Sequence, residues 1–203
     1  MLVAPVIILL LAITGYPLVY NIWNSFHFDN LSYGGLPHNF VGWKNFTTMF
    51  DSPQWVSALE RTLVFTVVTI VFDMVVGMGL ALMMHRQFRG RGFLRASILI
   101  PWAMPTVVSA MLWKTMFDPS AGFVDYILAA FHPAWSGLAW LNINTLRAWT
   151  AIFIADSWKN IPFVAILLLA GLQVIPNDVY EAARIDGASW WQSFTRVTLP
   201  LLK

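Results

Sequence analysis

Residues 63–84 read LVFTVVTIVFDMVVGMGLALMM, and this stretch decides the class of fold. It is apolar apart from a few glycines and threonines and one carboxylate, Asp73. About 20 helical residues cross the hydrocarbon core of a bilayer, which is about 30 Å thick. Because lipid offers no hydrogen-bond partner to a backbone N–H or C=O, a stretch of this kind predicts a membrane-spanning helix.

Three further apolar stretches continue this pattern along the chain. They lie at about residues 1–23, 93–117 and 148–174. The first could be a signal peptide, but it lacks a basic start and a clear cleavage site, which favours a retained span. The sequence therefore predicts an all-α membrane protein, a polytopic helix bundle with four spans in a single transmembrane domain over residues 1–203.

The composition of the whole chain agrees with a lipid-exposed protein. Hydrophobic residues make up 58% of the chain and charged residues 11%, whereas soluble domains carry about 25% charge. A chain of 203 residues cannot enclose so much apolar surface in a core. The net charge is only +2, so no nucleic-acid partner is expected. The absence of cysteine excludes disulfide frameworks, thiol catalysis and cysteine-based metal sites.

Arginines beside the second stretch indicate its orientation. Residues 85–95 read HRQFRGRGFLR, with four arginines in a short loop. The positive-inside rule places such a loop in the cytoplasm. Segments 24–58 and 118–146 are then external, and the polar tail that begins at Gln173 is cytoplasmic.

The cytoplasmic stretch 175–200 reads IPNDVYEAARIDGASWWQSFTRVTLP. Pro176 is expected to end the preceding span, and Asp178 with Glu181 is expected to form a capping-box-like start to a short helix. Gly187 can adopt a positive φ and turn the chain. The pattern predicts a rigid helix–turn–helix that can transmit force to a partner protein. The residues of its second helix expected to face the membrane are Trp191, Phe194 and Val197.

The same stretch resembles the E-A-A–x–x–D-G-A signature of ABC importer permeases, which is followed after about nine residues by x-L-P. Residues 99–105, LIPWAMP, and 158–163, WKNIPF, look like the carbohydrate-uptake branch, whose members carry maltose, trehalose or glycerol 3-phosphate. The resemblance implies a permease fold of the type I importer kind, with a coupling loop at about 175–198 that docks on an ATPase subunit. The docking residues that it implies are Glu181, Ala182, Ala183, Asp186, Gly187 and Ala188.

By resemblance, the chain is the permease subunit of a binding-protein-dependent importer that moves a sugar into the cytoplasm. The implied partners are an ATPase dimer, a second permease subunit, an external solute-binding protein and the lipid of a bacterial or archaeal cytoplasmic (inner) membrane. ATP and Mg²⁺ would be bound by the ATPase, and this chain would need no cofactor of its own. Relatives of this branch continue through two more helices, so we expect a truncated or partial subunit.

Prolines within the apolar stretches point to a substrate pathway. Pro101, Pro105 and Pro162 each remove a helical N–H, and transporters place such broken helices around binding sites. In maltose-type permeases, which these stretches resemble, aromatic faces cover the apolar side of a sugar while polar groups bond its hydroxyls. Three positions depart from the family pattern and leave the sugar open. The residues implied to line the pathway are Trp102, Thr106, Asp156, Trp158, Asn160 and Phe163.

Enzyme motifs are missing from this sequence. It has no Gly-x-x-x-x-Gly-Lys-Ser/Thr phosphate loop, and its histidines lack metal-ligand spacing. No catalytic residue and no metal ligand are therefore expected. An ABC permease for a polyamine, phosphate or another polar solute remains an alternative. A membrane-embedded enzyme, an assembly factor or a channel subunit would be a function of another class.

Overall fold

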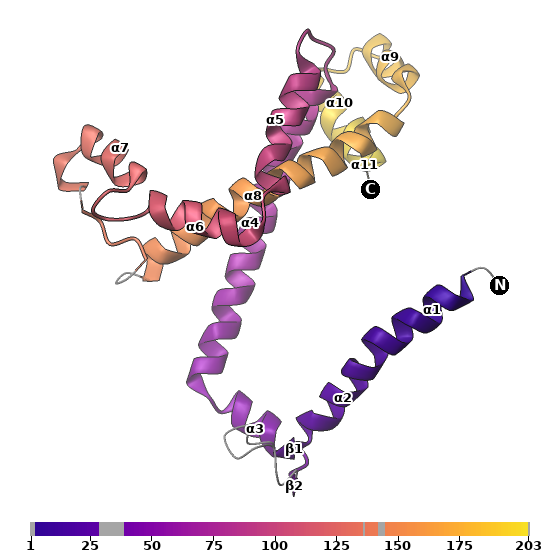
Figure 1. Ribbon diagram of the computed structural model, residues 1–203. Helices are drawn as coiled ribbons and strands as arrows, with labels where there is room; N and C mark the ends of the chain where they lie inside the picture. The colour runs from indigo at the N-terminus through magenta and orange to yellow at the C-terminus, as the bar shows by residue number, and fades with distance from the viewer. Residues whose placement is uncertain (1–2, 29–38, 136, 142–144, 203) are drawn as a thin grey trace. The chain divides into compact units, whose positions relative to one another are not determined.

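The computed structural model describes residues 3–28, 39–135, 137–141 and 145–202 (Figure 1). The external segments expected at 24–58 and 118–146 therefore lie partly outside the described residues. The chain divides into two compact units, Met1–Val64 and Phe65–Lys203. Each unit is described by itself below.

The first unit begins with a long helical rod. Helix α1 (Ala4–Leu10), the π-helical turn η1 (Leu11–Gly15) and α2 (Tyr16–Ser25) follow one another without a gap. None of their residues is buried. Such a rod of apolar side chains suits a surface that faces lipid.

A strand pair and two side-chain hydrogen bonds join the end of α2 to the segment that follows it. Strand β1 (His27–Phe28) pairs antiparallel with β2 (Asn39–Phe40), so the described fold contains a short two-stranded sheet beside its helices. Helix α3 (Lys44–Phe50) follows. The side-chain amide of Asn45 donates to the carbonyls of Ser25 and His27, both at 2.9 Å. These bonds tie α3 to the end of α2 and to β1.

The second unit is built on long helices. Helix α4 (Pro53–His85) begins in the first unit and runs without a break into the second. After the arginine loop come the remaining elements: α5 (Arg91–Ala103), α6 (Thr106–Met116), α7 (Phe123–Phe131), η3 (Pro133–Trp135), α8 (Thr145–Val174), α9 (Asn177–Ile185), α10 (Trp190–Ser193), η4 (Phe194–Thr198) and α11 (Leu199–Leu201).

The core of this unit lies between the ends of α4 and α8. Gly77 allows the two helices to approach closely, because an added Cβ would lie 2.9 Å from Cγ1 of Val164. Many large apolar side chains elsewhere stay exposed, as expected of a chain that uses lipid as its solvent. The residues of the core cluster are Ala81, Met84, Ala165, Leu169, Leu172 and Ile175.

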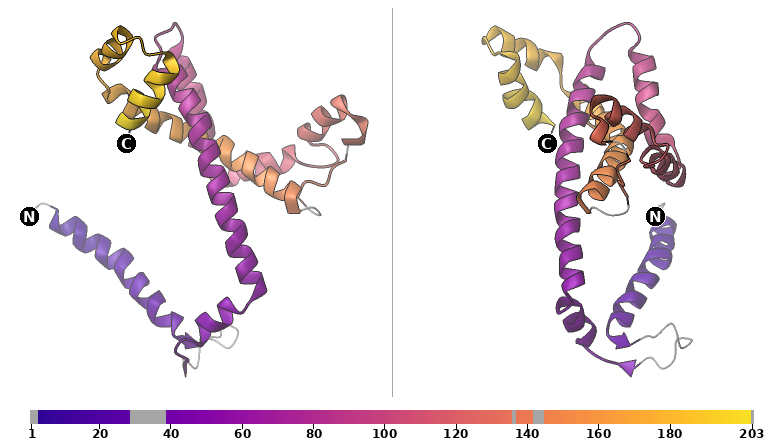
Figure 2. Two further views of the ribbon diagram at one scale, coloured as in Figure 1. Left: turned by 180° about the vertical axis from the view of Figure 1, so that it is seen from behind. Right: turned by 90° about the vertical axis from the view of Figure 1, so that its left-hand side faces the viewer.

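The helices lie near the expected spans, with one correction. The rod Ala4–Ser25, α4 and residues Leu146–Val174 are long and apolar enough to cross a membrane. The single helix expected over 93–117 is wrong: α5 and α6 meet at 91°, and Figure 2 shows this sharp bend. Pro105 causes it, because the residue before a proline is pushed into extended backbone, and Met104 has ψ 138°.

Candidate functional site

Two regions of the second unit gather the residues that the sequence singled out. The first is the hairpin of α9 and α10, which contains the expected coupling loop. Gly187 has a φ of 77°, which confirms the predicted turn. The N–H of Ala188 donates to the carbonyl of Ala183 at 2.9 Å, and the N–H of Gly187 donates to that of Arg184 at 3.0 Å. This pair of bonds is the Schellman ending of a helix, in which glycine takes the left-handed position.

The capping box of the hairpin lies at its second helix, so the box predicted at Asp178 and Glu181 is wrong. Helix α9 has Pro176 as its N-cap, and no side chain caps it. Asp178 therefore falls within the first helical turn, where its charge can act only on the helix dipole. At α10, Ser189 accepts from the N–H of Gln192, and the Gln192 side chain accepts from the N–H of Ser189.

One face of the hairpin is exposed, and the other face packs against the rest of the second unit. Glu181 and Ala182 are exposed, while Ala183 is half-buried. On the packed face, the Tyr180 hydroxyl bonds to Oγ1 of Thr198 at 3.2 Å, and Tyr180 packs against the core between α4 and α8. The remaining predicted docking residues also lie at the turn: Asp186 and Gly187 are exposed, and Ala188 is half-buried.

The second region is the break between α5 and α6. Since the nitrogen of Pro105 has no hydrogen to donate, helical bonding is interrupted there. Lys159, on α8, donates from Nζ to the carbonyl of Met104, the C-cap of α5, at 2.6 Å. A cation is also favoured beside the carbonyls that end a helix. In the part of the chain that the structure describes, no ion pair joins Lys159 to Asp156, although their spacing allowed one.

A cavity of about 330 Å³ opens beside this break, between α6 and α8. Its volume is at the lower end of the range for small-molecule sites. Apolar walls and a few polar groups face the same space, which is the combination that binds a polar ligand with an apolar face. The residues that line it are Thr106, Ser109, Ala110, Trp113, Lys114, Phe117, Leu141, Ala151, Ile152, Ala155, Asp156 and Lys159.

The six residues expected along the pathway fall into separate groups. Thr106 and Asp156 line the cavity. Trp158 contacts Trp113 edge to face, with ring centroids 5.6 Å apart. The remaining residues lie elsewhere: Trp102 stacks on Phe163 with ring centroids 5.5 Å apart, and Asn160 is half-buried on α8.

Sequence reasoning missed the α6 wall of the cavity. Ser109 is buried, and the indole N–H of Trp113 is buried without a hydrogen-bond partner in the described structure. Phe117 stacks on Trp113 with ring centroids 5.5 Å apart. Thr106, Ser109, Trp113 and Phe117 recur at intervals of three and four residues. That helical spacing was the signal that could have found this face.

Hydrogen bonds to the side chain of Asp118 hold the turn that follows α6. Its Oδ1 accepts from the N–H and the hydroxyl of Ser120 and from the N–H of Ala121. The hydrogen bond from the Ser120 hydroxyl is the main reason that the pKa of Asp118 is lowered from its ordinary value. A Cβ at Gly122 would lie 2.3 Å from the carbonyl oxygen of Asp118, so this tight turn requires glycine there.

Comparison with known proteins gives one consistent result. Residues 73–203 match the family described as the inner membrane component of binding-protein-dependent transport systems. The chain is 38% identical over 203 residues to the trehalose/maltose transport system permease protein MalF of Thermococcus litoralis, covering 100% of this chain and 67% of that protein. It is 38% identical over 205 residues to the trehalose transport system permease protein SugA of Mycobacterium tuberculosis, covering 100% and 64%.

A solved structure agrees with these relatives. The chain is similar, with a TM-score of 0.80 and 26% identity, to a chain of a bacterial alginate ABC transporter in complex with an alginate pentasaccharide-bound periplasmic protein. The match covers 99% of this chain and 65% of that one. The chain thus spans about two thirds of the length of the relatives it matches. It belongs to the family of inner membrane components of binding-protein-dependent transport systems, and it is a polytopic α-helical membrane protein with the ABC importer permease fold.

Proposed function

We propose that this chain is the permease subunit of an importer that carries a sugar or sugar derivative into the cytoplasm. The observation that carries the proposal is the cavity at the α5–α6 break, where two aromatic rings, Trp113 and Phe117, share a space with Thr106 and Asp156. Rings of this kind cover the C–H face of a sugar, and the hydroxyl and carboxylate can bond its hydroxyls. The relatives named for trehalose and maltose support the same class of substrate.

The driving force would come from partner chains. In this proposal α9 docks in an ATPase subunit, with Glu181 and Asp186 making polar contacts or caps at the joint, and ATP with Mg²⁺ is bound and hydrolysed there. A second permease subunit completes the pathway, and an external solute-binding protein delivers the sugar. The solved transporter in complex with a sugar-bound periplasmic protein supports the last of these partners. The chain itself then acts in transport and performs no chemical step.

A sugar that carries an anionic group is a second candidate. Lys114 and Lys159 both line the cavity, against the single carboxylate of Asp156. Two cations facing one anion favour a substrate with a negative charge. The relatives named for sulfoquinovosyl glycerol and for sn-glycerol 3-phosphate transport are consistent with this substrate class.

Uptake by the complete importer, reconstituted with its ATPase and its binding protein, tests the function. Labelled trehalose, maltose, glycerol 3-phosphate, putrescine and inorganic phosphate are offered in separate experiments. ATP-dependent uptake of a sugar or sugar phosphate supports the proposal. Uptake of putrescine or phosphate alone would reject the substrate class, and uptake that does not depend on the ATPase would reject the importer mechanism.

A further inference from the structure

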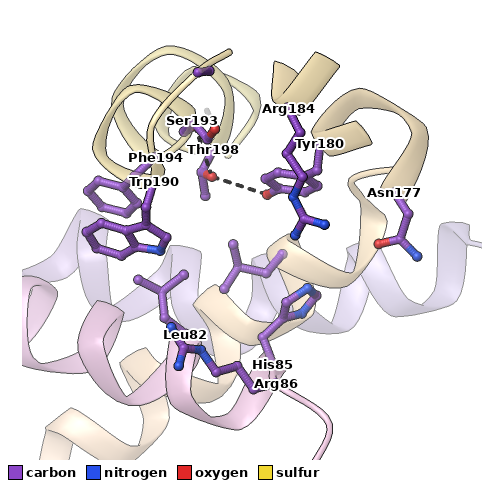
Figure 3. A pocket seen from close by; sticks show the side chains of 12 residues that line it. Leu82, His85, Arg86, Asn177, Tyr180, Arg184, Trp190, Ser193, Phe194 and Thr198 are labelled. Carbon is purple, nitrogen blue, oxygen red and sulfur yellow. Dashed lines mark hydrogen bonds between the residues drawn. The ribbon is translucent and has the colours of Figure 1, made fainter. Parts of the chain in front are cut away.

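A second cavity, of about 560 Å³, lies behind the coupling hairpin. Its walls come from the end of α4, the end of α8, helix α9 and the segment α10–η4, all within the second unit (Figure 3). It shares no lining residue with the cavity at the α5–α6 break. The proposed transport function makes no use of it.

Basic side chains are part of the polar lining of this cavity. His85 is the last residue of α4, Arg86 follows it directly, and Arg184 comes from the last turn of α9. Figure 3 shows Arg184 and His85 on facing sides of the opening. None of the described residues that line the cavity is an aspartate or a glutamate. Among the described residues, the guanidinium groups of Arg86 and Arg184 form no ion pair or hydrogen bond. The charges of these two arginines are therefore available for an anion.

Apolar and aromatic side chains complete the lining. They are Leu82, Leu172, Trp190 and Phe194, and Leu82 lies beside Arg86 (Figure 3). Trp190 stacks on Phe194 with ring centroids 5.7 Å apart, and it remains 62% exposed, as does its neighbour Trp191. Tryptophan is enriched where a protein meets the headgroup region of a bilayer. A cavity that combines arginines with apolar side chains and an exposed indole ring suits an amphiphile with an anionic head.

The position of the cavity along the chain indicates which amphiphile. It lies where α4 ends and the arginine loop 85–95 begins, the side that the positive-inside rule assigns to the cytoplasm. The cytoplasmic leaflet is rich in anionic phospholipids, and basic pockets at the ends of spans bind their headgroups. Arginine pairs with phosphate through two parallel N–H bonds, which makes it well suited to such a headgroup.

We propose that this cavity binds the phosphate of an anionic phospholipid, with Arg86 and Arg184 as its ligands and with the acyl chains leaving along Leu82 and Trp190. The bound lipid would bridge the end of α4 and the coupling hairpin. It would thereby hold α9 in place for its partner. A membrane lipid then takes part in coupling as a structural ligand, which goes beyond the proposed transport of a sugar.

The test uses the complete importer in nanodiscs of phosphatidylcholine with and without phosphatidylglycerol. Lipid retained by the protein after mild extraction is counted by native mass spectrometry. The double variant R86Q/R184Q is compared with R89Q/R91Q, which removes the same amount of charge from the arginine loop 85–95 but from residues that do not line the cavity. The variant R86K/R184K keeps the charge and checks that folding survives substitution at both sites.

The wild type and R89Q/R91Q are expected to retain phosphatidylglycerol, and R86Q/R184Q is expected to bind it about 30-fold more weakly. R86K/R184K should bind at an intermediate level. Equal losses in both glutamine variants would overturn the proposal, since the effect would then be one of net charge. It is also overturned if the wild type retains no phosphatidylglycerol, or if inorganic phosphate at millimolar concentration displaces the lipid completely, because the ligand would then be a free anion.

Discussion

Lys159 and Met104 are 55 residues apart in the chain, and the lysine Nζ donates to the methionine carbonyl at 2.6 Å. This bond ties the middle of α8 to the point where α5 turns into α6. The same lysine lines the cavity at that turn. A movement of α8 is therefore expected to shift the wall of the proposed sugar site.

Replacing Lys159 by methionine should destabilise the second unit. The substitution keeps the length of the side chain but leaves the Met104 carbonyl without its donor, at a cost of about 2 kcal/mol for a hydrogen bond to a charged group. Arginine at the same position should recover most of the loss, because it restores a cationic donor. Thermal unfolding of the purified importer, followed by tryptophan fluorescence, measures the difference. A methionine variant as stable as the wild type would show that the bond contributes nothing.

Pro105 should be responsible for the angle between α5 and α6. With alanine at this position, an N–H is restored and Met104 is released from its extended backbone, so the two helices are expected to approach a straight line. The chain contains no cysteine, so spin labels can be placed at Gly92 and Met116 without background. Electron–electron distance measurements should give a longer separation in P105A than in the wild type. P101A is the matched control, since Pro101 lies inside an unbroken helix and its loss should leave the distance unchanged.

The three prolines illustrate how far sequence reasoning reached. Each was predicted to remove a helical N–H, and on local grounds they are equivalent. Pro101 and Pro162 nevertheless stay within continuous helices, and only the segment at Pro105 breaks. The donor that stabilises this break is Lys159, which comes from a distant part of the chain. A long-range contact of that kind cannot be obtained from a local pattern.

The coupling hairpin was more accessible to prediction for the opposite reason. The turn at Gly187 depends on one residue type and its immediate neighbours, so the pattern was sufficient. The error concerned only which helix has the capping box, and it arose because both Asp178 and Ser189 are followed three residues later by a suitable partner. Pro176, by acting as the N-cap itself, moves Asp178 inside α9. The residues of the α6 wall share a helical spacing from Thr106 to Phe117, but their neighbours across the cavity come from α8, which a local pattern does not show.

Filling the cavity at the α5–α6 break should reduce uptake. Ala155 lines this cavity, and phenylalanine at that position would occupy part of its 330 Å³. Uptake by the reconstituted importer is expected to fall on the order of tenfold, which corresponds to about 1.4 kcal/mol of lost binding. Ala170 lies exposed on the same helix, so A170F provides the same substitution away from the cavity. If A155F transports sugar at the rate of A170F, the cavity is not the substrate site.

Gly187 should be needed for docking of the ATPase. Alanine at a φ of 77° costs about 1–2 kcal/mol, because its Cβ is forced towards the neighbouring carbonyl in left-handed backbone. The hairpin of G187A is therefore expected to loosen, and less ATPase should be recovered when the permease is purified. Gly92 serves as the control, since it lies in a helix with no atom within 4 Å of an added Cβ. Equal recovery of the ATPase with G187A and G92A would exclude this turn from the docking geometry.

The turn after α6 should depend on pH only in acid solution. The pKa of Asp118 is lowered, chiefly by the hydrogen bond from the Ser120 hydroxyl, so the ionised carboxylate favours the folded turn. This contribution is fully present above the pKa of the unfolded chain and is lost as the pH falls through the lower pKa of the folded turn. Carboxyl ¹³C shifts of labelled Asp118 should therefore titrate below the ordinary value near 3.9. In S120A the pKa should rise towards that value, and an unchanged titration in S120A would mean that the hydroxyl does not hold the carboxylate.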